Sequence, residues 1–173
     1  MTIAESPADA VPEGPRRIGI EVRSAGNAAL IREIVPDHEV CDLPAVSAAD
    51  ATATLDMVIV DGSGLSRSRA SLLAWRGQAQ PVILPALLIV DARANPGDKL
   101  RHELGHSVDD VLRVPASRQE VRARIDNLLR LRALSCRQHA RLEQTSEALA
   151  GANRALRTLH AGNEVLVRAQ DEQ

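Results

Sequence analysis

The sequence predicts an α/β domain with a five-stranded, parallel, doubly wound sheet, followed by a long C-terminal coiled-coil helix. Short apolar runs alternate with helical patterns of about ten residues, which is typical of βαβ units. Two runs, residues 57–60 (MVIV) and 87–90 (LLIV), are continuously apolar, as strands covered on both faces are. The segment from Ser117 to Gln173 contains no proline, and this predicts the long helix.

Five strands are expected before this helix, and any functional site should lie where they end. The predicted strands are residues 18–22, 39–43, 55–60, 85–90 and 110–114. The predicted helices between them are residues 27–35, 47–54, 66–77 and 98–104. Ligands of doubly wound sheets bind at the carboxyl ends of the strands. The candidate region is therefore near Val22, Asp61, Asp91 and Val114.

The 173 residues suit one domain and an extension. Residues 1–15 contain three prolines and many small residues, which predicts a disordered leader. The domain is expected over residues 16–130 and the long helix over 117–173, with a coiled coil from about residue 128.

Composition narrows the class of protein. The net charge of −2 does not indicate binding to nucleic acid or to a membrane surface. No apolar run reaches the roughly 18 residues that a membrane span needs. Cys41 and Cys136 match no metal or redox spacing, so a reduced, cytoplasmic protein without a cofactor is expected.

Three segments in the right order resemble the receiver domains of response regulators, of the CheY-like type, across roughly residues 16 to 132. Residues 55–61 (LDMVIVD) are similar to the family's third strand, which ends in the phosphoacceptor aspartate. Asp91 and Ala92 follow 30 residues later, where the family's fourth strand ends in Thr or Ser and then Ala. Residues 107–115 (SVDDVLRVP) follow the frame of the fifth strand, GADDYLxKP. The resemblance implies a CheY-like fold and a role in two-component signal transduction.

The positions that carry the family's chemistry differ here. The acidic pair that holds Mg²⁺ is reduced to Glu21, and the Thr or Ser that binds the phosphoryl group aligns with Asp91. A carboxylate there would repel a phosphoryl dianion. The family's switch aromatic aligns with Val111 and its lysine aligns with Val114.

Of these functional positions, only Asp61 clearly has the residue that the family has. We therefore predict a degenerate pseudo-receiver, not an enzyme, in which Asp61 is a strand-end carboxylate that caps the following loop. The alternative is a phosphorylatable receiver with Asp61 as the phosphoacceptor.

Residues 102–106 (HELGH) match the HExxH pattern of zinc metallopeptidases. In that alternative His102 and His106 would bind zinc and Glu103 would act as general base. A third protein ligand is required, and the conceivable one, Glu120, follows an intervening strand. Gly105 should end the helix before His106. We therefore interpret the two histidines as exposed residues near a helix C-terminus.

A capping box from Ser117 to Glu120 predicts the start of the last helix. If fully helical to Gln173, it would be about 85 Å long. Val121, Ile125 and Leu128 should face the sheet. From there a seven-residue pattern predicts a dimer interface. It comprises Leu128, Leu131, Leu142, Leu149, Leu156, Leu159, Asn163 and Leu166.

Asn163 at an a position of this pattern favours a parallel, in-register homodimer. Ser135, Gln138 and Thr145 would weaken three layers, as suits a helix that transmits signals; the alternative is a static dimerisation stalk. Residues 152–173 resemble the linker helices that precede GAF, PAS, kinase or cyclase domains in bacterial sensors. This resemblance implies a signalling partner or a fused output or sensor domain.

Overall fold

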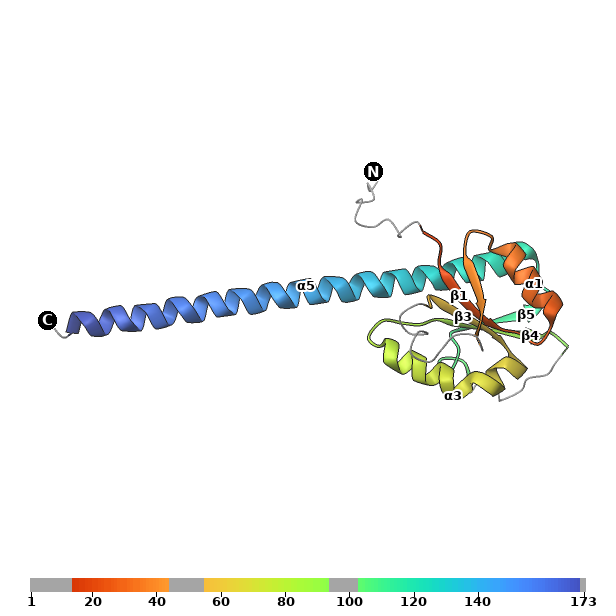
Figure 1. Cartoon of the computed structure of the whole chain (residues 1–173), viewed down its shortest axis with the longest axis horizontal. Helices are drawn as coiled ribbons and strands as arrows, with labels where there is room; N and C mark the ends of the chain where they lie inside the picture. The colour runs from red at the N-terminus through yellow and green to blue at the C-terminus, as the bar shows by residue number, and fades with distance from the viewer. Residues whose placement is uncertain (1–13, 44–54, 94–102, 172–173) are drawn as a thin grey trace. The chain divides into compact units, whose positions relative to one another are not determined.

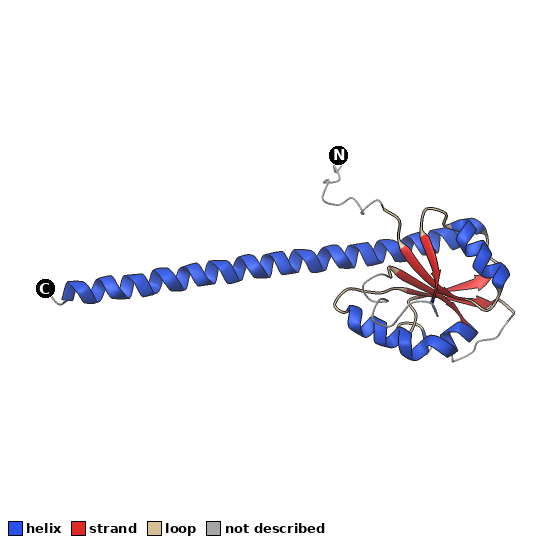
Figure 2. Cartoon of the chain, in the orientation of Figure 1, coloured by secondary structure: helices blue, strands red, loops and turns tan. Residues whose placement is uncertain are grey.

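The computed structural model describes residues 14–43, 55–93 and 103–171, with side chains described up to Arg157. Five strands form one sheet in the order β2-β1-β3-β4-β5, and every neighbouring pair is parallel (Figure 2). The strands are β1 (Arg17–Glu21), β2 (Glu39–Asp42), β3 (Met57–Asp61), β4 (Ala86–Asp91) and β5 (Asp110–Val114). The described helices are α1 (Ala25–Ile34), α3 (Gly62–Ala79) and α5 (Arg118–Asp171). The predicted parallel, doubly wound sheet and the long C-terminal helix are confirmed.

The predicted strands match the observed ones to within two residues. The helix predicted over residues 47–54 lies outside the described residues, as does most of the one predicted over 98–104. The start of α3 differs most, because the helix begins at Gly62 and not at Ser66. Asp61 is its N-cap residue and accepts a hydrogen bond from the Gly64 N–H, so the helix follows the strand directly.

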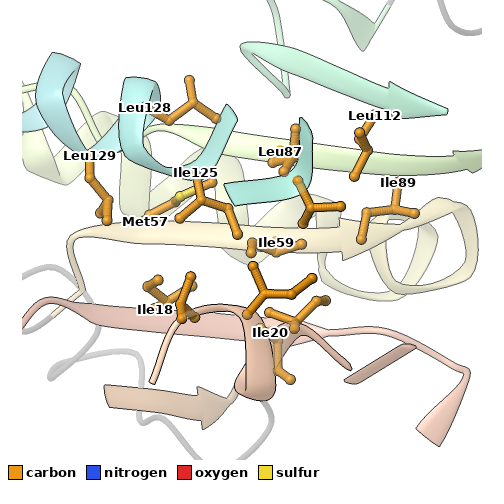
Figure 3. Packing of buried hydrophobic residues seen from close by; sticks show 14 of the residues in the cluster. Ile18, Ile20, Met57, Ile59, Leu87, Ile89, Leu112, Ile125, Leu128 and Leu129 are labelled. Carbon is orange, nitrogen blue, oxygen red and sulfur yellow. The ribbon is translucent and has the colours of Figure 1, made fainter. Parts of the chain in front are cut away.

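Each face of the sheet is covered by helices, α1 and α5 on one side and α3 on the other (Figure 1). Successive residues of a strand point to opposite faces, and β3 is buried on both. Met57 and Ile59 pack under α1 and α5, whereas Val58 and Val60 pack under α3. Figure 3 shows Ile125 and its neighbours on α5 lying over the side chains of β1, β3 and β4.

The start of α5 agrees with the predicted capping box, because the Ser117 hydroxyl accepts a hydrogen bond from the Glu120 N–H at 3.1 Å. Val121, Ile125 and Leu128 are buried on the sheet, as expected. Leu128 is only 7% exposed in the single chain, so it offers no surface to a partner. This corrects its assignment to the dimer interface. Ser135, predicted to weaken a layer of that interface, is also buried.

The chain divides into two compact units, one up to Cys136 and one from Arg137 onward. The described part of the second unit is helical, to Asp171. Among the described helices, no stretch combines the length and the apolar character that crossing a membrane requires.

Candidate functional site at the carboxyl ends of the strands

The residues predicted to form a site lie along one edge of the sheet. Glu21, Asp61, Asp91 and Val114 are the last residues of β1, β3, β4 and β5. The register of the sheet brings these ends close together. Asp91 pairs with Val114, and Glu21 pairs with the residue before Asp61. The strands are parallel, so these ends share the edge at which doubly wound domains bind ligands.

Both oxygens of the Asp61 carboxylate accept hydrogen bonds. Its Oδ1 accepts from the Gly64 N–H at 2.7 Å and from the Ser63 hydroxyl at 2.8 Å. Its Oδ2 accepts from the Arg23 N–H at 2.6 Å. Burial alone would raise the pKa of Asp61, but these donors favour the ionised form and hold the pKa below its usual value. Asp61 therefore stabilises the start of α3 and fastens the loop after β1, as the capping interpretation predicts.

Glu21, the last residue of β1, is paired with an arginine. Its Oε1 accepts a hydrogen bond from Arg67 Nε of α3 at 2.7 Å. The Glu21 side chain is 11% exposed and the Arg67 side chain 55% exposed, so the guanidinium covers the carboxylate. Mg²⁺ binds carboxylate and water oxygens. The Glu21 carboxylate is already in an ion pair with Arg67, which competes with binding of the metal.

Gly64 brings the first turn of α3 directly against the end of β1. A Cβ atom on Gly64 would collide with the carbonyl oxygen of Glu21 and lie 3.0 Å from its carbonyl carbon. The same Cβ would be 3.3 Å from Asp61 Oδ1. Only glycine allows this approach, which keeps the helix N-terminus, the Asp61 carboxylate and the β1 end in contact.

The other predicted positions have structural surroundings. Asp91 Oδ1 accepts a hydrogen bond from the Arg93 N–H at 2.8 Å and closes a local turn. The Val114 carbonyl accepts from the Ala92 N–H at 2.9 Å, which ties the ends of β4 and β5. The side chains of Val111 and Val114 pack against the two core clusters. Neither valine can supply the cation or the hydroxyl that binds a phosphoryl group.

Only part of the HELGH segment is described, because His102 lies outside the described residues. The carboxylate of Glu103 forms an ion pair with Arg69 of α3, with a shortest distance of 3.2 Å. Gly105 has a φ of 78° and lies two residues after Glu103, the last helical residue of this segment, and His106 follows in a turn. Within the described part of the chain, no three His, Cys, Asp or Glu side chains could together hold a metal ion.

The amino ends of the strands carry an ion-pair network that sequence reasoning missed. Asp109 accepts two hydrogen bonds from Arg76 of α3, at 2.6 and 2.8 Å, and one from the Ala86 N–H at 2.8 Å. The next residue, Asp110, accepts from Arg124 of α5 at 2.8 Å. Adjacent strand residues point to opposite faces, so this acidic pair ties β5 to the helices on both sides. Asp109 is 33 residues from its partner in the sequence and Asp110 is 14 residues from its own. No short sequence pattern therefore indicates either ion pair.

No family model matches this chain, and a comparison with curated proteins finds no match. Solved structures do match it. A CheY-like protein (tadZ) from Pseudomonas aeruginosa is 16% identical, with a TM-score of 0.51, over 65% of this chain and 98% of that one. A response regulator from Thermotoga maritima is 12% identical, with a TM-score of 0.50, over 66% and 98%. The globular unit has the CheY-like receiver fold.

NtrX from Brucella abortus is 17% identical, with a TM-score of 0.51, over 78% of this chain but 29% of its own length. At these identities the likeness concerns the receiver fold alone. The role of each side chain therefore follows from the geometry of the strand ends described above.

Proposed function

We propose that this chain is a signal-transduction module, a receiver fold that has lost its phosphorylation chemistry and works through α5. In this proposal α5 pairs with that of a second copy as a parallel coiled coil and passes a conformational signal to a partner or to a fused output or sensor domain. The observation that carries the proposal is the Asp61 carboxylate, whose Oδ1 caps α3 and whose Oδ2 accepts from the Arg23 N–H in the loop after β1.

Phosphorylation of an aspartate needs a free carboxylate oxygen and a bound Mg²⁺ beside it. Attack by Oδ1 of Asp61 would compete with the hydrogen bonds that begin α3, and attack by Oδ2 would compete with the bond from the Arg23 N–H. The acid that could hold the metal, Glu21, is paired with Arg67. A phosphoryl group would also find no cation at Val114 and would meet the charge of Asp91. These features favour a structural role for Asp61 over a role as a phosphoacceptor.

The second part of the proposal rests on exposed leucines beyond the globular unit. Leu142, Leu149 and Leu156 are spaced seven residues apart and are 68%, 65% and 64% exposed in the single chain. Full burial of a leucine side chain contributes roughly 1.5–3 kcal/mol. A second α5 in parallel register would cover all three, because a seven-residue repeat keeps one stripe facing the partner.

Incubation with acetyl phosphate and Mg²⁺, followed by intact mass measurement, tests the loss of chemistry. We expect no phosphorylated species for the wild-type chain. The Asp61→Asn variant serves as the matched control for labelling elsewhere. A stable phosphorylated product that disappears in Asp61→Asn would contradict the pseudo-receiver proposal and support the phosphoacceptor alternative.

The molar mass in solution, measured over a range of concentrations, tests the pairing. We expect a dimer that dissociates when Leu149 and Leu156 are both replaced by serine. A matched variant replaces Gln144 and Glu147 by serine, which are exposed positions outside the leucine stripe. It should remain dimeric. A wild-type mass of one chain at all concentrations would refute the coiled coil.

A further inference from the structure

The segment of α5 from Leu131 to Ser135 faces the globular unit on one side and the solvent on the other. On the inner side, Arg132 donates a hydrogen bond to the Ile83 carbonyl at 2.8 Å. The Ile83 N–H donates to the Ser135 hydroxyl at 3.0 Å. Ala133 is buried between them. We call these two hydrogen bonds to the backbone of Ile83 the Ile83 clamp. They hold the loop between α3 and β4 against α5.

The more exposed side of the same five residues is apolar. Leu131 and Leu134 are 38% and 41% exposed, although the residues between them are engaged or buried. In the frame that places Leu142 and Leu149 at a positions, Leu131 is a d position and Leu134 the adjacent g position. The apolar stripe therefore begins within the globular unit and not beyond it.

We infer that Leu131 and Leu134 form the first contact of the dimer interface, made with the same residues of a second copy. This inference rests on the proposed function. Leu131 belongs to the same seven-residue frame as Leu142, Leu149 and Leu156. The a position between them, Ser135, is buried on the globular unit, so a parallel partner would meet the d and g positions there. The neighbouring Arg132 is directed to the Ile83 carbonyl, which keeps its charge on the inner side.

Leu131 and the clamp residue Ser135 are neighbours one turn apart on the helix, and we infer that pairing and the α3–β4 loop are coupled through them. α3 begins at the Asp61 cap and ends at Ala79, four residues before Ile83. A displacement of α3 or its loop would act on the turns that carry Leu131. By linkage, pairing at Leu131 would stabilise the clamped position of the loop. This gives the pseudo-receiver an input that does not depend on phosphorylation.

Disulfide formation between copies tests the contact. In a full-length chain with Cys41→Ala and Cys136→Ser, Leu131→Cys should form a covalent dimer under mild oxidation. A disulfide requires Cα atoms about 4.4–6.8 Å apart, which identical d positions of a parallel pair can reach. Arg130→Cys is the matched control, since Arg130 is exposed and adjacent but lies off the stripe. Leu149→Cys reports on the distal stripe.

The outcomes separate this inference from the proposed function. Cross-linking of Leu149→Cys but not of Leu131→Cys would overturn the inference and leave the coiled coil intact. Equal cross-linking of Leu131→Cys and Arg130→Cys would indicate random collision and would also overturn it. Failure at both leucine positions, with the mass of one chain, would refute the proposed function as well.

The coupling has its own test. Adding Ser135→Ala removes the hydroxyl that accepts the Ile83 N–H. Cross-linking at Leu131→Cys should slow about five-fold, the factor that corresponds to one lost hydrogen bond. Cross-linking at Leu149→Cys should be unchanged. Equal rates at Leu131→Cys with and without Ser135→Ala would show that the clamp does not act on the interface.

Discussion

Replacement of Gly64 by alanine should destabilise the globular unit, although alanine is the better helix former. In the interior of a helix, glycine to alanine stabilises by about 1 kcal/mol. At Gly64 the new Cβ would collide with the Glu21 carbonyl oxygen, a backbone atom that cannot rotate away. Overpacking of this kind costs about 1–3 kcal/mol and occasionally more. We expect a net loss of about 2 kcal/mol in the free energy of unfolding.

Gly77 of the same helix is the matched control, because a Cβ there meets nothing within 4 Å. Gly77→Ala should stabilise by about 1 kcal/mol, so the two variants should differ by about 3 kcal/mol. Trp75 is the only aromatic residue of the chain and is buried on α3. Its fluorescence during urea unfolding, at fixed protein concentration, reports on the globular unit. If Gly64→Ala were as stable as Gly77→Ala, the close contact between α3 and β1 would be wrong.

Three further changes test other contacts. Asp61→Ala should cost about 1 kcal/mol at neutral pH through loss of the cap. Because the folded-state pKa of Asp61 is lowered, its contribution is present above the usual value of 3.8 and lost as pH falls through the folded-state pKa. Unfolding curves of variant and wild type should therefore converge in acid. A double-mutant cycle with Arg76→Ala and Asp109→Ala should give a coupling of about 1 kcal/mol or more, and additive effects would refute the ion pair. Ile125→Ala should cost about 2–5 kcal/mol in thermal or urea unfolding, and a smaller loss would question how α5 packs on the sheet.

The sheet could be predicted from sequence because its strands are marked by local features. Residues 57–61 and 86–91 form continuous apolar runs that end at an acidic residue, and such runs need no knowledge of distant partners. The start of α3 was predicted four residues late, since Gly62 and Gly64 are typical of loops. The cap that overrides them depends on the orientation of the Asp61 side chain, which a sequence does not give.

The state of the site was predictable only in part. The absence of a second acid beside Glu21 and of a lysine at Val114 is visible in the sequence. The pairing of Glu21 with Arg67 is not, because the two residues are 46 positions apart and Arg67 lies among other arginines of α3. Leu128 shows the same limit: one periodic pattern fits both the sheet and a partner helix, and only the packing reveals which one covers it.

The acidic pair Asp109 and Asp110 makes the entry into β5 sensitive to length. The two residues reach helices on opposite faces only because they are adjacent in an extended chain. An alanine inserted between them would turn one carboxylate to the wrong face and shift the register of β5 against β4. Such an insertion should unfold the unit more readily than Asp110→Ala, as Trp75 fluorescence would report. The substitution removes one ion pair, whereas the insertion shifts the pairing of the whole strand.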